Sequence, residues 1–485
     1  MNNNGSTGFF TTFSNRFWLY SILCLAAVLR LYKLDFKSLW IDELYSVVST
    51  NPANPIDFII NYCKSDQPPF YFLILHFWFK IFAYTSFYAR LFSVVVGVIS
   101  VAATYLLGKE IRGKRTGLIA SFLCAVNYFH IYYSQEARFY VLLYLMTIVS
   151  FIFFIRSIKK RSALNYGFYL IVTVGLIYTQ YFGILVFFIQ GFILTVYCLL
   201  IDRRKTRLLL DGAFLAVLIA ISFVPWMPIL IHDSGITSFW IEKPKPWFPA
   251  VYYYIYWNKD IFLGLILAFM AALYLKKYLS DIRAGLATNL EVFTGMLLVS
   301  WMVLSYTVPY IRSLLLIPVL IPRYTIIALP AMFVVIALGV ETISNKKIVG
   351  VVLCITLLSV CLNLFVIQGH YTRIDKCQWR ESAQAVIDHY TPGTIVYSNQ
   401  EWWYNYYFYT TEPRIRVLGK FSSDEAAELG PFIAMIENEK ELWVLSGETA
   451  DGLSISQRQY VEKHFKIKDA FNFFAASAVL YEKKD

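Results

Sequence analysis

Long apolar runs recur along the chain from residue 17 to residue 368, and no other feature constrains its fold as strongly. Each run is close to the ~20 residues that an α-helix needs to cross the hydrocarbon core of a bilayer. Of the 485 residues, 58% are hydrophobic and 15% are charged, which excludes an ordinary soluble domain. The sequence therefore predicts a multi-spanning α-helical membrane protein with about 11 transmembrane helices. The expected spans are residues 17–33, 88–107, 117–133, 139–155, 164–180, 181–201, 208–230, 257–275, 291–308, 324–342 and 348–368.

Short basic loops between the spans indicate the orientation of the chain. Loops rich in Lys and Arg face the cytoplasm, and this assigns the N-terminus to the cytoplasm and the segment 369–485 to the extracytoplasmic side. The same loops hold most of the net charge of +11, so the charge reports orientation and contact with membrane lipids, and no nucleic-acid partner is expected. The loops contain Lys109, Arg112, Lys114 and Arg115; Arg156, Lys159, Lys160 and Arg161; Arg203, Arg204, Lys205 and Arg207; Lys276 and Lys277; and Lys346 and Lys347.

One further apolar segment, residues 68–84, does not fit this scheme as a span. Counting it as a crossing would reverse the side of every later basic loop, so we expect an interfacial or re-entrant helix instead. His76 and Lys80 lie four residues apart and give such a helix a polar side. Residues 34–87 then form one external loop with interfacial helices, within a transmembrane domain that covers residues 1–368.

The C-terminal segment, residues 369–485, differs in composition from the rest of the chain. From Lys376 onward charges become frequent, and short β-rich runs alternate with helical stretches. The pattern predicts a small α/β domain. The β-rich runs are residues 394–398, 414–418, 441–446 and 477–482, and the clearest helical stretches are 379–390 and 454–464.

The stretch SLWIDELYS places two adjacent carboxylates, Asp42 and Glu43, where the chain leaves its first span. Adjacent side chains on a helix point about 100° apart, so only one of the two can address a given substrate atom. A neighbouring like charge and partial burial raise the pKa of a carboxyl group, which suits a general base. We expect Asp42 to be that base and Glu43 to support it. The alternative is a solvated acidic pair that caps an interfacial helix.

Asp66 precedes the pair Pro68 and Pro69. It is a candidate for a further catalytic carboxylate, and the alternative, which the spacing favours, is an N-cap for the helix that begins there.

Two helix starts on the outer side carry a cation. Ser134 is expected to cap the fourth span, with Glu136 and Arg138 in its first turns, and Arg323 follows Pro322 at the start of the tenth. Free N–H groups and a guanidinium fork together suit a phosphate, so we expect an anionic lipid headgroup there. The alternatives are a Glu136–Arg138 ion pair and an Arg323 that reaches to membrane phosphate. The candidate phosphate-binding residues are Arg138, Arg323, Gln135, Tyr324 and Lys80.

The sequence leaves metal binding open. His76, His130 and His232 all fall on the expected outer side, yet none has the spacing of a paired metal ligand. A divalent metal therefore stays a possible cofactor without an assigned ligand.

Five stretches taken in order resemble the bacterial membrane glycosyltransferases of the GT-C class, relatives of the protein O-mannosyltransferases and the lipid A aminoarabinose transferases. They are SLWIDELYS, QPPFYFLILHFWFKIF, FYARLFSVVVGVISVAATYLLGKEIRGKRTG, HIYYSQEARFYVLLYL and PRYTIIALPAMFVV, within residues 15–370. The resemblance implies a polyprenyl-phosphate sugar donor and transfer at the extracytoplasmic face of a bacterial plasma (inner) membrane. It matches Asp42 to the catalytic acid of the first loop, with Glu43 beside it and Asp66 before the double proline. Relatives often have His or Lys where this chain has Gln67.

The expected function is transfer of that sugar to a hydroxyl of a glycan, lipid or protein acceptor, with inversion at the sugar. One alternative is a transporter or flippase for the same lipid carrier, although transporters usually place charges near the midplane of the bilayer and show related halves. Another is a membrane anchor for the C-terminal domain, which leaves Asp42 and Glu43 unexplained.

Overall fold

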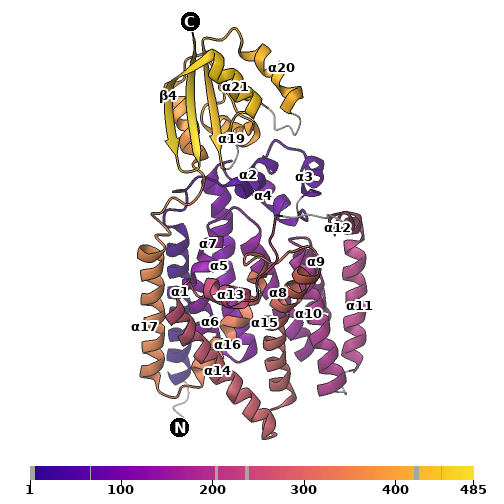
Figure 1. Cartoon of the computed structure of the whole chain (residues 1–485). Helices are drawn as coiled ribbons and strands as arrows, with labels where there is room; N and C mark the ends of the chain where they lie inside the picture. The colour runs from indigo at the N-terminus through magenta and orange to yellow at the C-terminus, as the bar shows by residue number, and fades with distance from the viewer. Residues whose placement is uncertain are drawn as a thin grey trace. The chain divides into compact units, whose positions relative to one another are not determined.

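A computed structural model describes residues 6–65, 67–202, 206–234, 240–419, 425–448 and 451–484 (Figure 1). The chain divides into two compact units. The membrane unit comprises Met1–Tyr32, Ile56–Ile74 and Leu91–Tyr371, and the C-terminal unit comprises Lys33–Pro55, Leu75–Arg90 and Thr372–Asp485. Asp42 and Glu43 thus belong to the same unit as the end of the chain.

The fold is mostly helical, as expected, and every one of the expected spans coincides with one or more helices. In the described ranges, eight helices are long and apolar enough to cross a membrane. The helices and helical turns that account for the expected spans are α1 Ser6–Leu31, α5 Ser86–Ile111, α6 Lys114–Val126, α7 Tyr128–Ser134, α8 Tyr140–Lys159, α9 Ala163–Ile177, α10 Phe182–Val196, η1 Tyr197–Ile201, α11 Thr206–Phe223, η3 Val224–Trp226, α12 Met227–Ser234, α14 Ile261–Arg283, α15 Asn289–Leu315, η4 Tyr324–Ala328, α16 Leu329–Glu341, α17 Lys346–Leu362 and η5 Asn363–Ile367.

The expected span 117–133 is interrupted. Asn127 adopts an extended conformation between α6 and α7, and its side-chain oxygen accepts a hydrogen bond from the His130 backbone. Its Nδ2 donates to the Tyr256 carbonyl, at the end of helix α13 Phe248–Tyr256, at 2.7 Å. An asparagine whose side chain bonds the backbone locally ends one helix and starts another, which hydropathy does not reveal.

Helix α16 lies at the centre of the membrane unit and packs against α6, α14 and α15 (Figure 1). Of the apolar stretch that η4 and α16 form together, 94% is buried, against 28% for the stretch formed by α17 and η5. Gly339 explains how closely α16 approaches α14, because a Cβ there would clash with the Met270 carbonyl oxygen.

Three short helices occupy the segment expected to be the first external loop. They are α2 Ile41–Ser49, α3 Ile56–Cys63 and α4 Phe70–Ile81. Helix α4 has 12 residues, about 18 Å in length, which is well short of the ~30 Å hydrocarbon core. An interfacial or re-entrant helix at residues 68–84 stays a prediction.

The C-terminal unit contains a mixed sheet of five strands in the order β2-β1-β3-β5-β4. The central strand β3 pairs in parallel with β1 and antiparallel with β5, with Trp443 opposite Val396 on one side and Leu480 on the other. The strands are β1 Ile395–Tyr397, β2 Val417–Leu418, β3 Glu441–Gly447, β4 Phe465–Phe473 and β5 Ala476–Lys483, and the helices are α18 Trp379–His389, α19 Glu401–Thr411, α20 Glu425–Ile436 and α21 Ile455–His464.

Alternate residues of β3 serve the two faces of this sheet. Leu442 and Val444 join a buried cluster with Phe432 of α20 and Val461 of α21. On the other face α18 packs against β3, β4 and β5. All four β-rich runs predicted from the sequence are strands, whereas β4, α19 and α20 were not predicted.

Helix α19 contains the aromatic cluster 402–409. Tyr404, Tyr406, Tyr407 and Phe408 are buried there, so most of the cluster contributes to the core of the C-terminal unit.

Candidate functional site

Helix α2 begins immediately before the two carboxylates. Trp40 precedes it in an extended conformation, and Asp42 and Glu43 occupy its first turn, where negative charge complements the helix dipole. The Glu43 carboxylate turns back and accepts a hydrogen bond from the Trp40 N–H at 3.3 Å. Glu43 therefore holds the helix start together from within.

Glu43 is fully buried and is neutralised by two cations. Arg90, near the start of α5, donates from Nε to Oε1 and from Nη2 to Oε2, both at 2.8 Å. Lys376 places its Nζ 3.0 Å from Oε2. A carboxylate out of contact with water needs such compensation, because its desolvation is costly.

Arg90 also shapes the loop that leads into α2. Its Nη1 donates to the carbonyl groups of Leu34 and Lys37 at 3.3 and 2.6 Å, and Nη2 donates to that of Ser38 at 2.9 Å. With the two bonds to Glu43, all five N–H donors of the guanidinium are used. One side chain thus fixes both the loop 34–38 and the first turn of α2.

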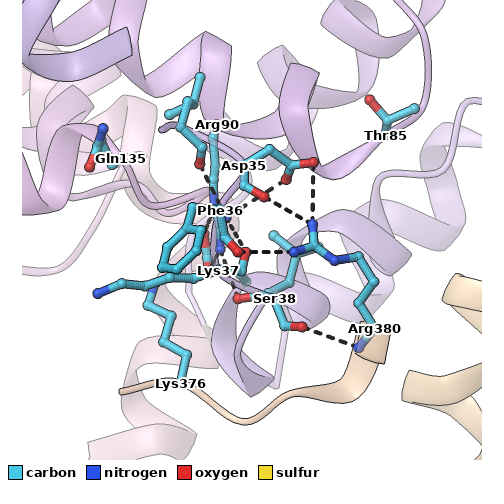
Figure 2. A network of polar contacts seen from close by, with 12 residues as sticks. Asp35, Phe36, Lys37, Ser38, Thr85, Arg90, Gln135, Lys376 and Arg380 are labelled. Atoms are coloured by element: carbon cyan, nitrogen blue, oxygen red, sulfur yellow. Dashed lines mark hydrogen bonds and ion pairs between the residues drawn. The ribbon is translucent and has the colours of Figure 1, made fainter. Parts of the chain in front are cut away.

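Residues 375–381, which we call the latch segment, hold the same loop from the other side (Figure 2). Lys37 pairs with Asp375 at 2.6 Å, and Ser38 donates to Glu381 at 2.5 Å. Arg380 donates to the carbonyl groups of Asp35 and Phe36 at 2.9 and 3.0 Å. Burial lowers the pKa of Lys37, and the bond to Asp375 opposes this effect.

Asp42 differs from its neighbour because it is half-buried. Glu448, in the turn after β3, is close enough for the charge of Asp42 to raise its pKa, although burial is the larger cause. The Ile41 backbone acts in the opposite direction by hydrogen bonding to the Glu448 carboxylate. Glu448 is therefore a third carboxylate at the start of α2, beside Asp42 and Glu43. The sequence analysis missed Glu448, since a single Glu in the turn SGETADG carries no motif.

Arg138 and Arg323 come together in the membrane unit around one buried ring, that of Tyr140. Their Cζ atoms lie 6.0 and 5.7 Å from its centroid. Arg138 also lies over Phe139 at 4.8 Å, and Arg323 over Tyr324 at 5.8 Å. Contact with an aromatic face restricts the orientation of a guanidinium group, and its N–H donors lie in the plane of the group.

The local structure around Arg138 corrects one sequence expectation. Ser134 does not cap the helix that follows, since α8 begins only at Tyr140 with Phe139 as the preceding residue. Ser134 ends α7, and its hydroxyl accepts a hydrogen bond from Arg30 at 3.2 Å. Glu136 and Arg138 therefore lie in the turn between the two helices.

The remaining candidate phosphate-binding residues lie in different surroundings. Gln135 donates to the Arg30 and Tyr32 carbonyl groups and contacts His370 at 2.7 Å, so its amide is engaged within the membrane unit. Lys80 belongs to the C-terminal unit, where it is exposed with Nζ 5.7 Å from the Phe77 ring. Asp66 lies outside the described residues.

The candidate metal ligands do not meet. His76 and His130 are buried, and His232 is exposed. Across the described ranges, no group of three or more His, Cys, Asp or Glu side chains could hold a metal ion.

Comparisons with known proteins relate this arrangement to a fold. Residues 66–232 match the family described as Dolichyl-phosphate-mannose-protein mannosyltransferase. ArnT from Cupriavidus metallidurans in the apo state superimposes with a TM-score of 0.63 at 12% identity, over 96% of this chain and 98% of that one. The chain has the GT-C fold.

Two further structures share the GT-C fold with this chain. ArnT from the same organism bound to undecaprenyl phosphate gives a TM-score of 0.59 at 14% identity, over 96% of this chain and 98% of that one. AglB from Archaeoglobus fulgidus, an archaeal oligosaccharyltransferase in complex with an inhibitory peptide and a dolichol-phosphate, gives 0.52 at 12% identity, over 96% of this chain and 74% of that one. A sequence search of the curated proteins finds no match.

Proposed function

We propose that this protein transfers a sugar from a polyprenyl-phosphate donor to an acceptor hydroxyl at the extracytoplasmic face of the membrane, with Asp42 as the general base. The observation that carries the proposal is the asymmetry between two adjacent carboxylates. Glu43 is buried and bound by Arg90 and Lys376, whereas Asp42 is half-buried in the same helical turn. A fixed neighbour beside an accessible carboxylate is what a positioned base requires.

The reaction needs a base at the acceptor and a cationic clamp at the leaving group. In the step we propose, the oxygen of the acceptor hydroxyl bonds to the anomeric carbon of the donor sugar. Asp42 takes the proton that this hydroxyl loses. The bond from that carbon to the phosphate oxygen breaks on the opposite side, which inverts the anomeric centre and releases polyprenyl phosphate. Arg138 and Arg323 would stabilise the negative charge on that phosphate, with Tyr324, Gln135 and Lys80 as further candidates. Asp66 is a further candidate carboxylate.

The identity of the donor rests on relatives with the same fold. One ArnT structure holds undecaprenyl phosphate, and the AglB structure holds a dolichol-phosphate together with a peptide. Both lipids are polyprenyl phosphates, so a lipid-linked sugar is the donor class that these relatives support. The acceptor class, whether glycan, lipid or protein, is left to experiment.

The site has to face outward for this chemistry. We propose that the N-terminus is cytoplasmic, that residues 1–368 form the transmembrane domain, and that residues 369–485 form an extracytoplasmic domain in a bacterial plasma membrane. A C-terminal reporter that is active only in the cytoplasm should then stay silent. A strong signal would overturn both the orientation and the outward site.

The direct test of the proposal is turnover by the purified protein in nanodiscs. Mass spectrometry of envelope lipids and glycans from cells with and without the protein would first identify the product, and hence the donor and acceptor to supply. Asp42→Asn should then lose about 10²- to 10⁴-fold in rate while keeping its fold and its lipid binding, since it removes the proton acceptor and keeps the size. Full activity of Asp42→Asn would remove the base from the mechanism. Movement of the lipid carrier across the membrane without sugar transfer would favour the flippase alternative instead.

A further inference from the structure

Lys376 is unusual among the lysines near the end of the chain because its charge is buried. Its side chain is 9% exposed, and the ammonium group lies 3.0 Å from Glu43 Oε2 and 5.9 Å from the centre of the Trp40 ring. Lys466 of β4, in contrast, pairs with Glu482 at 3.1 Å with 56% of its side chain exposed. Burying an ammonium group costs desolvation free energy, which a contact with a carboxylate can offset.

We propose that Lys376 is a positioning residue for sugar transfer, which holds the Glu43 carboxylate opposite Arg90 and thereby fixes the helix start that carries Asp42. The proposal rests on the function proposed above and adds a contribution of the C-terminal segment to the reaction.

The contacts of the Glu43 carboxylate show how this works. Oε1 accepts from Arg90 Nε, while Oε2 accepts from Arg90 Nη2, from the Trp40 backbone and from Lys376. Without Lys376, Arg90 would be the one cation that orients the Glu43 carboxylate. Oε2, which accepts the hydrogen bond from the Trp40 N–H, would then be held in place by Arg90 Nη2 without the lysine. Asp42 is adjacent to Glu43 in that turn, so a small rotation of the turn moves Asp42 relative to a bound acceptor. A displacement of about 1 Å in such a group is worth as much as 100-fold in rate.

Other contacts of the latch segment hold the loop before α2. Asp375, Arg380 and Glu381 reach Lys37, the backbone of Asp35 and Phe36, and Ser38. Lys376 reaches α2 itself, at the carboxylate beside Asp42. Removal of Lys376 should therefore leave the loop anchored and disturb the position of the base.

The experiment compares Lys376→Met, Lys376→Arg and the matched control Lys466→Met in nanodiscs, with the wild-type donor and acceptor. Methionine keeps the length of the stem and removes the charge. We expect Lys376→Met to lower kcat by about 10- to 100-fold with little change in donor KM, Lys376→Arg to recover most of the loss, and Lys466→Met to match the wild type. Thermal unfolding of each variant measures the folded fraction.

A double-mutant cycle with Glu43→Gln tests the route of the effect. If Lys376 acts through Glu43, then Lys376→Met combined with Glu43→Gln should be no slower than Glu43→Gln alone. Both proteins in this comparison carry Glu43→Gln, so the comparison stays informative if Lys376→Met folds poorly by itself.

Several outcomes would overturn the proposal. Lys376→Met with wild-type kcat, or a Lys376→Arg variant as slow as Lys376→Met, would leave the lysine without a positioning role. Full additivity in the double-mutant cycle would mean that Lys376 does not act through Glu43. In each of these cases an active wild type and an inactive Asp42→Asn would still support the proposed function, so the two failures are distinguishable.

Discussion

Two buried arginines, Arg90 and Arg30, lie at the ends of apolar helices and are stabilised in opposite ways. Arg90 at the start of α5 binds a buried carboxylate and three carbonyl groups of the loop before α2. Arg30 near the end of α1 donates to the Cys124 and Ala125 carbonyl groups at 3.1 and 2.9 Å, and it contacts His130 Nδ1 at 2.9 Å.

The partners explain what each arginine does. Cys124 and Ala125 lie in the last turn of α6, where carbonyl groups have no partner in the helix and the helix dipole is negative. A guanidinium is therefore favourable there without a carboxylate. Arg30 thus joins α1 to the interruption between α6 and α7. Arg90 instead orders a loop and a carboxylate beside a candidate base. For these two arginines, only Arg90 therefore has a partner that borders the candidate base.

The largest difference should appear when each arginine is replaced by methionine. Arg90→Met leaves the buried Glu43 carboxylate with Lys376 as its one cation. We expect the free energy of unfolding to fall by about 3–5 kcal/mol and the activity to be lost. Arg30→Met leaves helix-terminal carbonyl groups unpaired, and we expect a loss of about 1–3 kcal/mol. Unfolding of the two variants in detergent checks this order. Equal losses would mean that the carboxylate adds nothing to the role of Arg90.

Removing the carboxylate as well should sharpen the contrast. Arg90→Met combined with Glu43→Met and Lys376→Met deletes all three buried charges, so it should recover part of the stability lost in Arg90→Met, by about 1–3 kcal/mol, without recovering activity. Stability is measured by unfolding and activity by product formation. Failure to recover stability would show that the backbone contacts of Arg90, and not the ion pair, dominate.

Arg138 and Arg323 differ from both Arg90 and Arg30 because they lie against aromatic rings. Replacing them should change the affinity for the lipid donor. Arg138→Ala and Arg323→Ala are each expected to weaken binding of a polyprenyl phosphate by about 10- to 100-fold, because charge-assisted hydrogen bonds are lost. The corresponding lysine variants should lose less, since they keep a point charge. Affinity in nanodiscs is the measurement, with the exposed Arg414→Ala as control. Unchanged affinity in both alanine variants would place the donor phosphate elsewhere, with Lys80, His76 and Arg312, which lies in the last turn of α15, as the next candidates.

The smallest effect concerns Glu448. Burial and the charge of Asp42 raise its pKa above the ordinary value of 4.5, so the folded protein binds this proton more tightly than the unfolded chain. Stability from this group is therefore present at low pH and falls as the pH rises from the unfolded pKa through the folded one. Glu448→Gln removes the charge, so its Tm at pH 7 should exceed that of the wild type, on the order of 1 °C, with a smaller difference near pH 4. A lower Tm at pH 7 would show that the bond from Ile41 outweighs the repulsion.

Much of the fold could be predicted because it depends on local pattern. Hydropathy located the apolar helices, eight of which in the described ranges are long enough to cross a membrane, and β-rich runs located four of the five strands. The pattern failed where a single side chain decides the outcome, as at Asn127. It also failed at β4, whose residues are mostly exposed and therefore lack the alternation of a half-buried strand.

The candidate site was only partly legible in the sequence. The sequence shows directly that Asp42 and Glu43 are adjacent. Because adjacent side chains of a helix point in different directions, it also indicates that the two have different roles. Their roles remain predictions. The partners of Glu43 could not be found in this way, because Arg90 is 47 and Lys376 is 333 positions away along the chain. Nothing local marks a lysine as the partner of a carboxylate near the other end of the sequence.

The distance along the chain between Glu43 and Lys376 also sets an order of events during biosynthesis. Glu43 and Arg90 leave the ribosome early and can pair while later helices are still being made. Lys376 follows the last candidate span, which ends at Ile367. The ion cluster beside Asp42 is therefore completed only after every candidate span of the described chain has been synthesised, and a nascent chain that stops short of that point lacks the second cation on Glu43.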